Sequence, residues 1–233
     1  MMELVDVTKI YQQGRRTVQA VRGVSLRIEA GEYVSIMGPS GSGKSTLMHL
    51  MGALDTPTTG KALFGGKDLQ AMSDRQRSLL RRTRVGFVFQ FFNLLPTLTA
   101  VENVAMPLLL GGMSRRAALA KSAAALERVG LANRADHFPE ELSGGEMQRV
   151  AVARALVTKP EAVLCDEPTG NLDSVNSREI LGLLRELPEA GKRSVVMVTH
   201  DPLAAAVGDR IIHIADGVIA SEERVPLRPS VAV

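Results

Sequence analysis

A nine-residue loop near the start of the chain constrains the fold more than any other feature of the sequence. The loop consists of Gly38, Pro39, Ser40, Gly41, Ser42, Gly43, Lys44, Ser45 and Thr46. It matches the pattern G-x-x-x-x-G-K-[ST], which places glycines where the backbone must curl around a bound group. The apolar segment 33–37 precedes the loop, and helical spacing of apolar residues begins after it. This strand–loop–helix order predicts an α/β fold built on a parallel sheet.

The loop has the composition of a phosphate-binding site. Its backbone N–H groups and the N-terminus of the following helix are expected to bind phosphate oxygens. We expect Lys44 to reach the β- and γ-phosphates of a nucleotide and Ser45 to ligate Mg²⁺. A glycine turn with a surface lysine is the simpler alternative, but it explains neither the preceding strand nor the following helix.

A second candidate site follows another short apolar segment, 162–165. Asp166 and Glu167 stand at the end of this predicted strand, where a parallel sheet places its ligands. We expect Asp166 to hold Mg²⁺ through water and Glu167 to act as general base toward an attacking water. An Asp-Glu pair alone is usually the solvated end of an element, so it gains meaning only beside the phosphate-binding loop.

Composition narrows the class of protein. The 233 residues contain 28 Lys and Arg against 25 Asp and Glu, and this net charge of +3 does not by itself indicate a nucleic-acid partner. A single cysteine, Cys165, excludes an internal disulfide and suits a reducing compartment. The acidic start does not resemble a secretory signal, and the longest apolar stretch, around 104–110, is far shorter than the roughly 20 residues of a membrane span. We therefore expect any membrane role to depend on a partner chain.

Apolar periodicity predicts two kinds of sheet. Alternating patterns with glycine turns, up to Ile28, are typical of antiparallel strands. Short apolar runs at 85–89, 162–165 and 194–198 are separated by helical patterns, which indicates a parallel sheet.

Helical patterns dominate between 91 and 157, including an alanine-rich helix that begins after Ser114. The chain therefore divides into three parts. We expect residues 1–90 and 158–221 to form a β subdomain with the core, 91–157 to form an inserted helical subdomain, and 222–233 to form a loose tail.

A third motif decides among the nucleotide-binding families. The segment 142–149, L-S-G-G-E-M-Q-R, resembles the signature L-S-G-G-x-x-x-R of ABC (ATP-binding cassette) proteins. Its candidate site residues are Leu142, Ser143, Gly144, Gly145 and Glu146. Ser143 and the glycines open a helix N-terminus toward a phosphate, so the chain has two phosphate-facing helix starts.

The resemblance implies a RecA-like P-loop core, an N-terminal antiparallel β subdomain and an inserted helical subdomain. It also implies ATP and Mg²⁺ as ligands, ATP hydrolysis, and a head-to-tail homodimer. In that dimer, Ser143 and Gly145 of one subunit close over the ATP that Lys44 of the other subunit holds.

The resemblance extends along nearly the whole chain and implies roles for four more residues. Tyr11 would stack on adenine, with ordinary packing as its alternative role. Gln90 would sense Mg²⁺ and the γ-phosphate, and Asp173 would contact the partner's site. The residues before Leu172-Asp173 are Gly-Asn and depart from the Ser-Ala common in the family. His200 matches a histidine that touches the γ-phosphate, and we expect it to position groups rather than to transfer protons.

The segment after Gln90 resembles the branch of the family with lipoprotein-release, macrolide-export and FtsE-type division ATPases. The members of this branch pair with permeases that have few transmembrane helices. The resemblance implies such a partner, and a location at the cytoplasmic face of the inner (plasma) membrane. We expect Phe91, Phe92 and Leu95 to receive a short permease helix, with at least one of the aromatic side chains packed in the core instead.

Three other functions remain to be weighed against transport. FtsE-type regulation of an extracytoplasmic enzyme uses the same residues, so the sequence does not separate it from export. A soluble ABC ATPase acting on DNA or ribosomes would require a coiled-coil insertion, a zinc module or a second cassette, and the chain has none; we expect no nucleic-acid partner. A GTPase would require an N-K-x-D motif, which is also missing.

Overall fold

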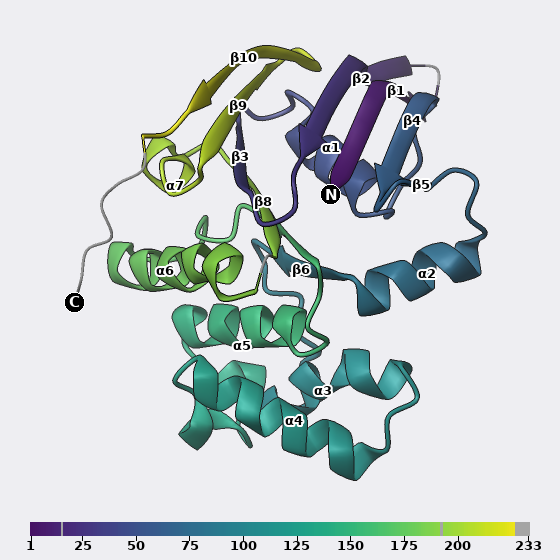
Figure 1. Cartoon of the computed structure of the whole chain (residues 1–233). Helices are drawn as coiled ribbons and strands as arrows, with labels where there is room; N and C mark the ends of the chain where they lie inside the picture. Colours follow the sequence, from purple (N-terminus) through teal and green to yellow (C-terminus); the bar gives the residue numbers. More distant parts are fainter. Residues whose placement is uncertain (15, 192, 227–233) are drawn as a thin grey trace.

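Two β-sheets and a group of helices make up the fold, which the computed structural model describes for residues 1–14, 16–191 and 193–226 (Figure 1). The smaller sheet contains β1 (Met2–Gln13), β2 (Arg16–Ile28), β4 (Thr59–Phe64) and β5 (Lys67–Asp68), in the order β2-β1-β4-β5. Its neighbouring strands are antiparallel. The antiparallel sheet predicted for the start of the chain is therefore confirmed.

The larger sheet has the order β10-β9-β3-β8-β7-β6. Its strands are β3 (Tyr33–Met37), β6 (Val85–Phe89), β7 (Ala162–Asp166), β8 (Ser194–Thr199), β9 (Arg210–Ala215) and β10 (Val218–Arg224). All neighbours are parallel except the edge pair β9–β10. Every residue of β8 is buried, because a central parallel strand is covered on both faces.

Helices cover both faces of the larger sheet. The helices of the described residues are α1 (Lys44–Met51), α2 (Asp74–Thr83), α3 (Ala100–Leu110), α4 (Arg115–Arg128), α5 (Gly144–Leu156), α6 (Ser174–Gly191) and the short α7 (Pro202–Ala205), of which α1 lies on one face of this sheet and α5 and α6 on the other. Figure 1 shows α3 and α4 as a separate group below α5, which is the inserted helical region. None of the helices in the described ranges is long and apolar enough to cross a membrane.

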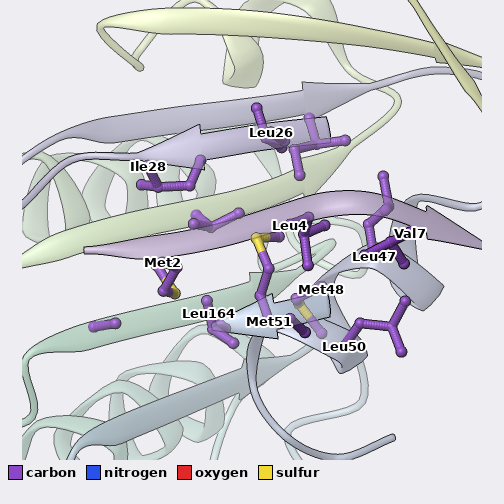
Figure 2. Close-up of a cluster of buried hydrophobic side chains, with 14 of the residues drawn as sticks. Met2, Leu4, Val7, Leu26, Ile28, Leu47, Met48, Leu50, Met51 and Leu164 are labelled. Carbon is purple, nitrogen blue, oxygen red and sulfur yellow. The ribbon is translucent and has the colours of Figure 1, made fainter. Parts of the chain in front are cut away.

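The main hydrophobic core lies between the two sheets and α1 (Figure 2). Met2 and Leu4 of β1 and Leu47 of α1 are buried in it, together with Leu164 of β7. The neighbouring residues of β7, Val163 and Cys165, belong instead to a second cluster with side chains from α5 and α6. Because alternate residues of a strand point to opposite faces, α1 and α5 lie on opposite faces of the larger sheet.

One predicted boundary is corrected by the structure. Residues 222–224 are not part of a loose tail, because β10 continues to Arg224 and pairs Glu222 with Ile212 and Arg224 with Arg210. The last seven residues of the predicted tail, 227–233, lie outside the described residues. The helix after Ser114 is present, although the Ser114 side chain makes no capping hydrogen bond.

Candidate functional site

The predicted phosphate-binding loop lies between the end of β3 and the start of α1. Gly43 is the N-cap residue of α1 and has φ of 101°, a left-handed conformation that favours glycine. A Cβ atom at this position would come within 2.3 Å of the carbonyl oxygen of Ala20. Conformation and space therefore both require glycine here, and the backbone N–H groups at the start of α1 are left to bind an anion.

The ammonium group of Lys44 lies against the inside of this loop. Its Nζ donates hydrogen bonds to the carbonyl oxygens of Gly38 and Pro39, each at 2.8 Å. The side chain of Lys44 is buried, and no carboxylate pairs with it among the described residues. A buried ammonium without an ion pair is suited to binding a phosphate group.

Ser45 and Asp166 are 121 residues apart in the sequence and are in direct contact in the fold. Ser45 Oγ donates a hydrogen bond of 3.0 Å to Asp166 Oδ1, so the first turn of α1 faces the end of β7. Burial raises the pKa of Asp166, and the hydrogen bond from Ser45 opposes this shift. A hydroxyl and a carboxylate oxygen are hard donors of the kind that Mg²⁺ prefers, so these two residues fit the ion. Gln90, the third predicted ligand, points instead to Asn171, with its Nε2 3.4 Å from Asn171 Oδ1.

Glu167 and His200 form a direct pair. His200 Nδ1 lies 2.9 Å from Glu167 Oε1, and this histidine follows β8 while the glutamate follows β7. The backbone N–H of Glu167 donates to the carbonyl oxygen of Val198, which ties the two strand ends together. Glu167 has φ of 47°, which is unfavourable for a non-glycine residue, and such conformations gather at functional sites.

Tyr11 has partners that the sequence did not reveal. Its hydroxyl donates to Asp55 Oδ2 at 2.8 Å, and the Nζ of Lys9 lies 4.9 Å from the centre of its ring. Burial and the hydrogen bond to Asp55 raise the pKa of Tyr11. Lys9 also pairs with Asp55 at 2.6 Å, so the tyrosine is held by a fixed polar cluster. Adenine stacking on Tyr11 stays a prediction.

The signature segment opens α5 with a capping box. Ser143 Oγ accepts a hydrogen bond from the backbone N–H of Glu146, and the carboxylate of Glu146 accepts one from the N–H of Ser143. That backbone hydrogen bond, aided by Arg134 at 2.9 Å, lowers the pKa of Glu146 to about 2. The capping box satisfies the N–H groups of Ser143 and Glu146 and leaves those of Gly144 and Gly145 available to an anion.

Gly145 lies against the segment that contains Asp173. A Cβ at Gly145 would come within 1.8 Å of Asn176 Oδ1, whereas a Cβ at Gly144 would meet nothing closer than 3.7 Å. Asn176 is held in place because its Nδ2 donates to Asp173 Oδ2 at 2.8 Å, and Asp173 also caps the start of α6. The start of α5 and the predicted partner-contacting segment are therefore packed as one unit.

Replacing Gly145 by alanine is expected to lower the free energy of unfolding by about 1–2 kcal/mol, because Asn176 must move and lose its bond to Asp173. Gly144→Ala is the matched control and is expected to be neutral or more stable by up to about 1 kcal/mol, since alanine favours a helix. Urea unfolding of both variants measures the difference. Equal stabilities would contradict a fixed position for Asn176.

Two polar residues of α5 were not predicted from the sequence, and they connect this helix to the segments after Glu167 and after Gln90. Gln148 is fully buried and its Nε2 donates to the carbonyl oxygen of Pro168, just after Glu167. Arg154 donates to the carbonyl oxygens of Phe92 and Asn93, at 2.7 and 2.6 Å. For Arg154, the available signal was a polar side chain in an otherwise apolar helical run, 150–156; Gln148 lies outside that run.

Arg154 fixes an unfavourable turn directly after Gln90. Phe92 and Asn93 have φ of 61° and 50°, and their carbonyl oxygens converge on the one guanidinium. Burial lowers the pKa of Arg154, which has no carboxylate partner among the described residues. We infer that this arginine holds the turn in place from the helix that carries the signature.

Replacing Arg154 by methionine is expected to speed amide hydrogen exchange at 91–95 by about tenfold or more, because hydrogen bonds from a charged group contribute about 1.5–3 kcal/mol each. The control is Arg149→Met on the same helix, which breaks the ion pair with Glu179 and leaves the turn untouched. Exchange measured by mass spectrometry distinguishes them. Unchanged exchange at 91–95 in Arg154→Met would show that the turn holds itself.

The sequence matches a known family and several known proteins. The family model described as ABC transporter matches residues 21–170, which is more than half of the chain. The lipoprotein-releasing system ATP-binding protein LolD of Shewanella denitrificans is 46% identical over 223 residues, which cover 96% of each chain. The macrolide export ATP-binding/permease protein MacB of Syntrophobacter fumaroxidans is 47% identical over 224 residues, but these cover 95% of this chain and only 31% of MacB.

A solved structure is similar to almost the whole of this chain. It is the ATP-binding cassette MJ0796 in a dimeric post-hydrolysis state bound to ADP and Pi. The TM-score is 0.91 and the identity 43%, and the match covers 98% of this chain and 100% of that one.

Proposed function

This chain belongs to the ABC transporter family as an ATP-binding and ATP-hydrolysing subunit, and we propose that two copies close head to tail on ATP to move a membrane permease. The permease is of the lipoprotein-releasing or macrolide-export type, as the names of LolD and MacB indicate for those relatives. With such a partner, the subunit would lie at the cytoplasmic face of the inner membrane.

One observation carries the proposal. The helices that begin at the two phosphate-binding motifs, α1 and α5, pack on opposite faces of the larger sheet. Two helix N-termini separated by a sheet serve one nucleotide only when a second copy supplies the other half. A dimer with twofold symmetry then forms two equal sites, each with Lys44 from one subunit and Ser143 from the other. The dimeric state of the solved relative supports this arrangement.

The site residues divide the hydrolytic reaction among them. Lys44 and the loop N–H groups bind the β- and γ-phosphates, and Ser45 and Asp166 would hold Mg²⁺, which neutralises charge on the phosphates. Glu167 accepts a proton from the water that attacks the γ-phosphorus, while the bond to the β-phosphate oxygen breaks and ADP leaves. His200, 2.9 Å from Glu167, orients this carboxylate. Gln90 would swing from Asn171 toward the γ-phosphate.

The permease contact is proposed beside the turn that Arg154 holds. The side chain of Phe91 is 72% exposed and that of Leu95 is 45% exposed, which is unusual for large apolar groups close together in sequence. Phe92 is partly buried and lies near Gly144, so it is the aromatic residue that packs internally. An apolar face of a permease helix would cover Phe91 and Leu95.

Light scattering of the purified chain tests dimer closure. The chain is expected to be a monomer without nucleotide and to double its mass with a non-hydrolysable ATP analogue and Mg²⁺. Gly144→Arg serves as the control, because a Cβ there meets nothing closer than 3.7 Å within the chain, while a bulky side chain at the start of α5 blocks the approach of the second copy. A monomer under all conditions, with ATP bound, would overturn the two-copy site.

A further inference from the structure

The start of α5 carries a carboxylate where the proposed function needs positive charge. A helix N-terminus is equivalent to roughly half of a positive charge, and Glu146 adds a full negative charge to the first turn. The backbone N–H of Ser143 and the guanidinium of Arg134 lower the pKa of Glu146 to about 2, so this carboxylate is ionised. By themselves, the helix start and Glu146 would repel the phosphates of a nucleotide.

Arg134 offsets the charge of this carboxylate. Its Nε donates to Glu146 Oε1 at 2.9 Å, and its Nη1 lies 3.3 Å from His137 Nε2. In the described part of the chain, Arg134 pairs with no other carboxylate. Its backbone lies in the connection between α4 and α5, where the carbonyl oxygen of Ala135 accepts a hydrogen bond from the N–H of Val101. With Arg134 in place, the start of α5 is again attractive to an anion.

Stability alone does not explain this ion pair. The side chain of Arg134 is 47% exposed, and exposed ion pairs contribute little to the free energy of folding. Glutamine in place of Glu146 would complete the same capping box without any charge. The pair is therefore better explained by its effect on a bound group.

Helix α3 begins with the same arrangement and shows what is different at α5. Thr99 and Glu102 form its capping box, and Arg115 pairs with Glu102 at 2.9 Å. The N–H groups of Ala100 and Val101 in its first turn donate to carbonyl oxygens of the connection between α4 and α5. These N–H groups are satisfied within the chain, so the start of α3 is not a site for an anion.

The first turn of α5 is open by comparison. No acceptor in the described ranges is found for the N–H groups of Gly144 and Gly145. These are the groups that the proposed function directs at the nucleotide of the second copy. The pair of Arg134 with Glu146 therefore lies at an open helix start, whereas the equivalent pair of α3 lies at a closed one.

We propose that Arg134 is a positioning residue for the nucleotide of the second copy: it neutralises Glu146, so that closure of two copies on ATP depends on Arg134 only while residue 146 is a carboxylate. Like charges brought together at an interface oppose association. Arg134 removes this repulsion through Glu146 and does not itself contact the phosphates. The proposal rests on the two-copy site of the proposed function.

Light scattering of the full chain with a non-hydrolysable ATP analogue and Mg²⁺ tests the proposal. Arg134→Met is expected to raise the chain concentration at which half of the molecules are dimers by about tenfold or more. Adding Glu146→Gln to this variant keeps the capping box, removes the negative charge and is expected to bring the concentration back to within about threefold of the unaltered chain. Glu146→Gln alone is expected to lower it, because Arg134 is then an unopposed cation.

The matched control is Arg115→Met, which removes the equivalent ion pair at the start of α3. It is expected to change the concentration for dimer formation by less than about twofold. A fluorescent ATP analogue measures nucleotide binding to the diluted single chain. Because the loop around Lys44 lies on the other face of the larger sheet, Arg134→Met is expected to weaken this binding by less than about twofold.

Three results would overturn the proposal. They are normal dimer formation by Arg134→Met, failure of Glu146→Gln to restore it, and equal impairment of Arg115→Met. The second result would mean that Arg134 contacts the phosphates directly. If the unaltered chain dimerises and any of these results is found, only the role of Arg134 is removed. An unaltered chain that binds ATP and never dimerises removes the proposed function instead.

Discussion

Glu167→Gln slows ATP hydrolysis by about a hundredfold or more and leaves ATP binding intact, because glutamine cannot accept the proton of the attacking water. The amide oxygen of glutamine still accepts a hydrogen bond from His200, so the geometry at the ends of β7 and β8 is kept. Phosphate release in a single turnover measures the chemical step, and a fluorescent ATP analogue measures binding.

The matched control is Glu161→Gln. Glu161 stands before the first residue of β7 and Glu167 follows its last one, so the ion pair of Glu161 with Arg84 lies at the opposite end of the strand from the candidate site. Hydrolysis by this control is expected to stay within about twofold of the unaltered chain. If Glu167→Gln hydrolyses ATP at a comparable rate, the carboxylate is not the base, and its contact with His200 is structural.

Ser143→Arg abolishes hydrolysis without preventing nucleotide binding. Arginine removes the hydroxyl that caps α5 and fills the space in front of the helix N-terminus, but the loop around Lys44 on the other face of the sheet is unchanged. Lys44→Ala is expected to fail for the opposite reason, since it removes the cation that holds the phosphates of its own subunit. Each purified variant alone is therefore inactive.

A mixture of the two variants is the decisive measurement. A mixed dimer contains one site that combines the intact Lys44 of one subunit with the intact Ser143 of the other. Equal mixing makes half of the dimers mixed, and up to roughly a quarter of normal activity returns if the two sites act independently. Hydrolysis that remains at the level of the separate variants would contradict a site shared between subunits.

The strand–loop–helix at the phosphate-binding loop was predictable because its determinants are local. The glycines, the apolar strand before them and the helical spacing after them all lie within a few residues of Lys44. Asp166 and Glu167 could also be placed, because parallel strands present their ends at one edge of a sheet. The meeting of Ser45 with Asp166 and of Glu167 with His200 follows from that topology.

Residues that act across long sequence separations were not predictable in the same way. Arg154 holds carbonyl oxygens at Phe92 and Asn93, and no local pattern states which loop a buried arginine reaches. The end of the chain was misjudged because Glu222 and Arg224 are polar, and an edge strand tolerates polar residues when its partner supplies the hydrogen bonds. The hydrogen bond from Tyr11 to Asp55 was also not predictable, because the two residues are 44 positions apart in the sequence.

Helix α5 links the signature segment to the turn after Gln90. Helix α5 is about 20 Å long; its N-cap residue is Ser143, and Arg154 near its other end donates a hydrogen bond to the carbonyl oxygen of Phe92. A ligand bound at one end of α5 can therefore change the binding affinity at the other end, and thermodynamic linkage makes this effect reciprocal. If binding of a membrane subunit raises the affinity for ATP by some factor, binding of ATP raises the affinity for the membrane subunit by the same factor. Measuring how far one ligand changes the affinity for the other thus also gives the reciprocal change.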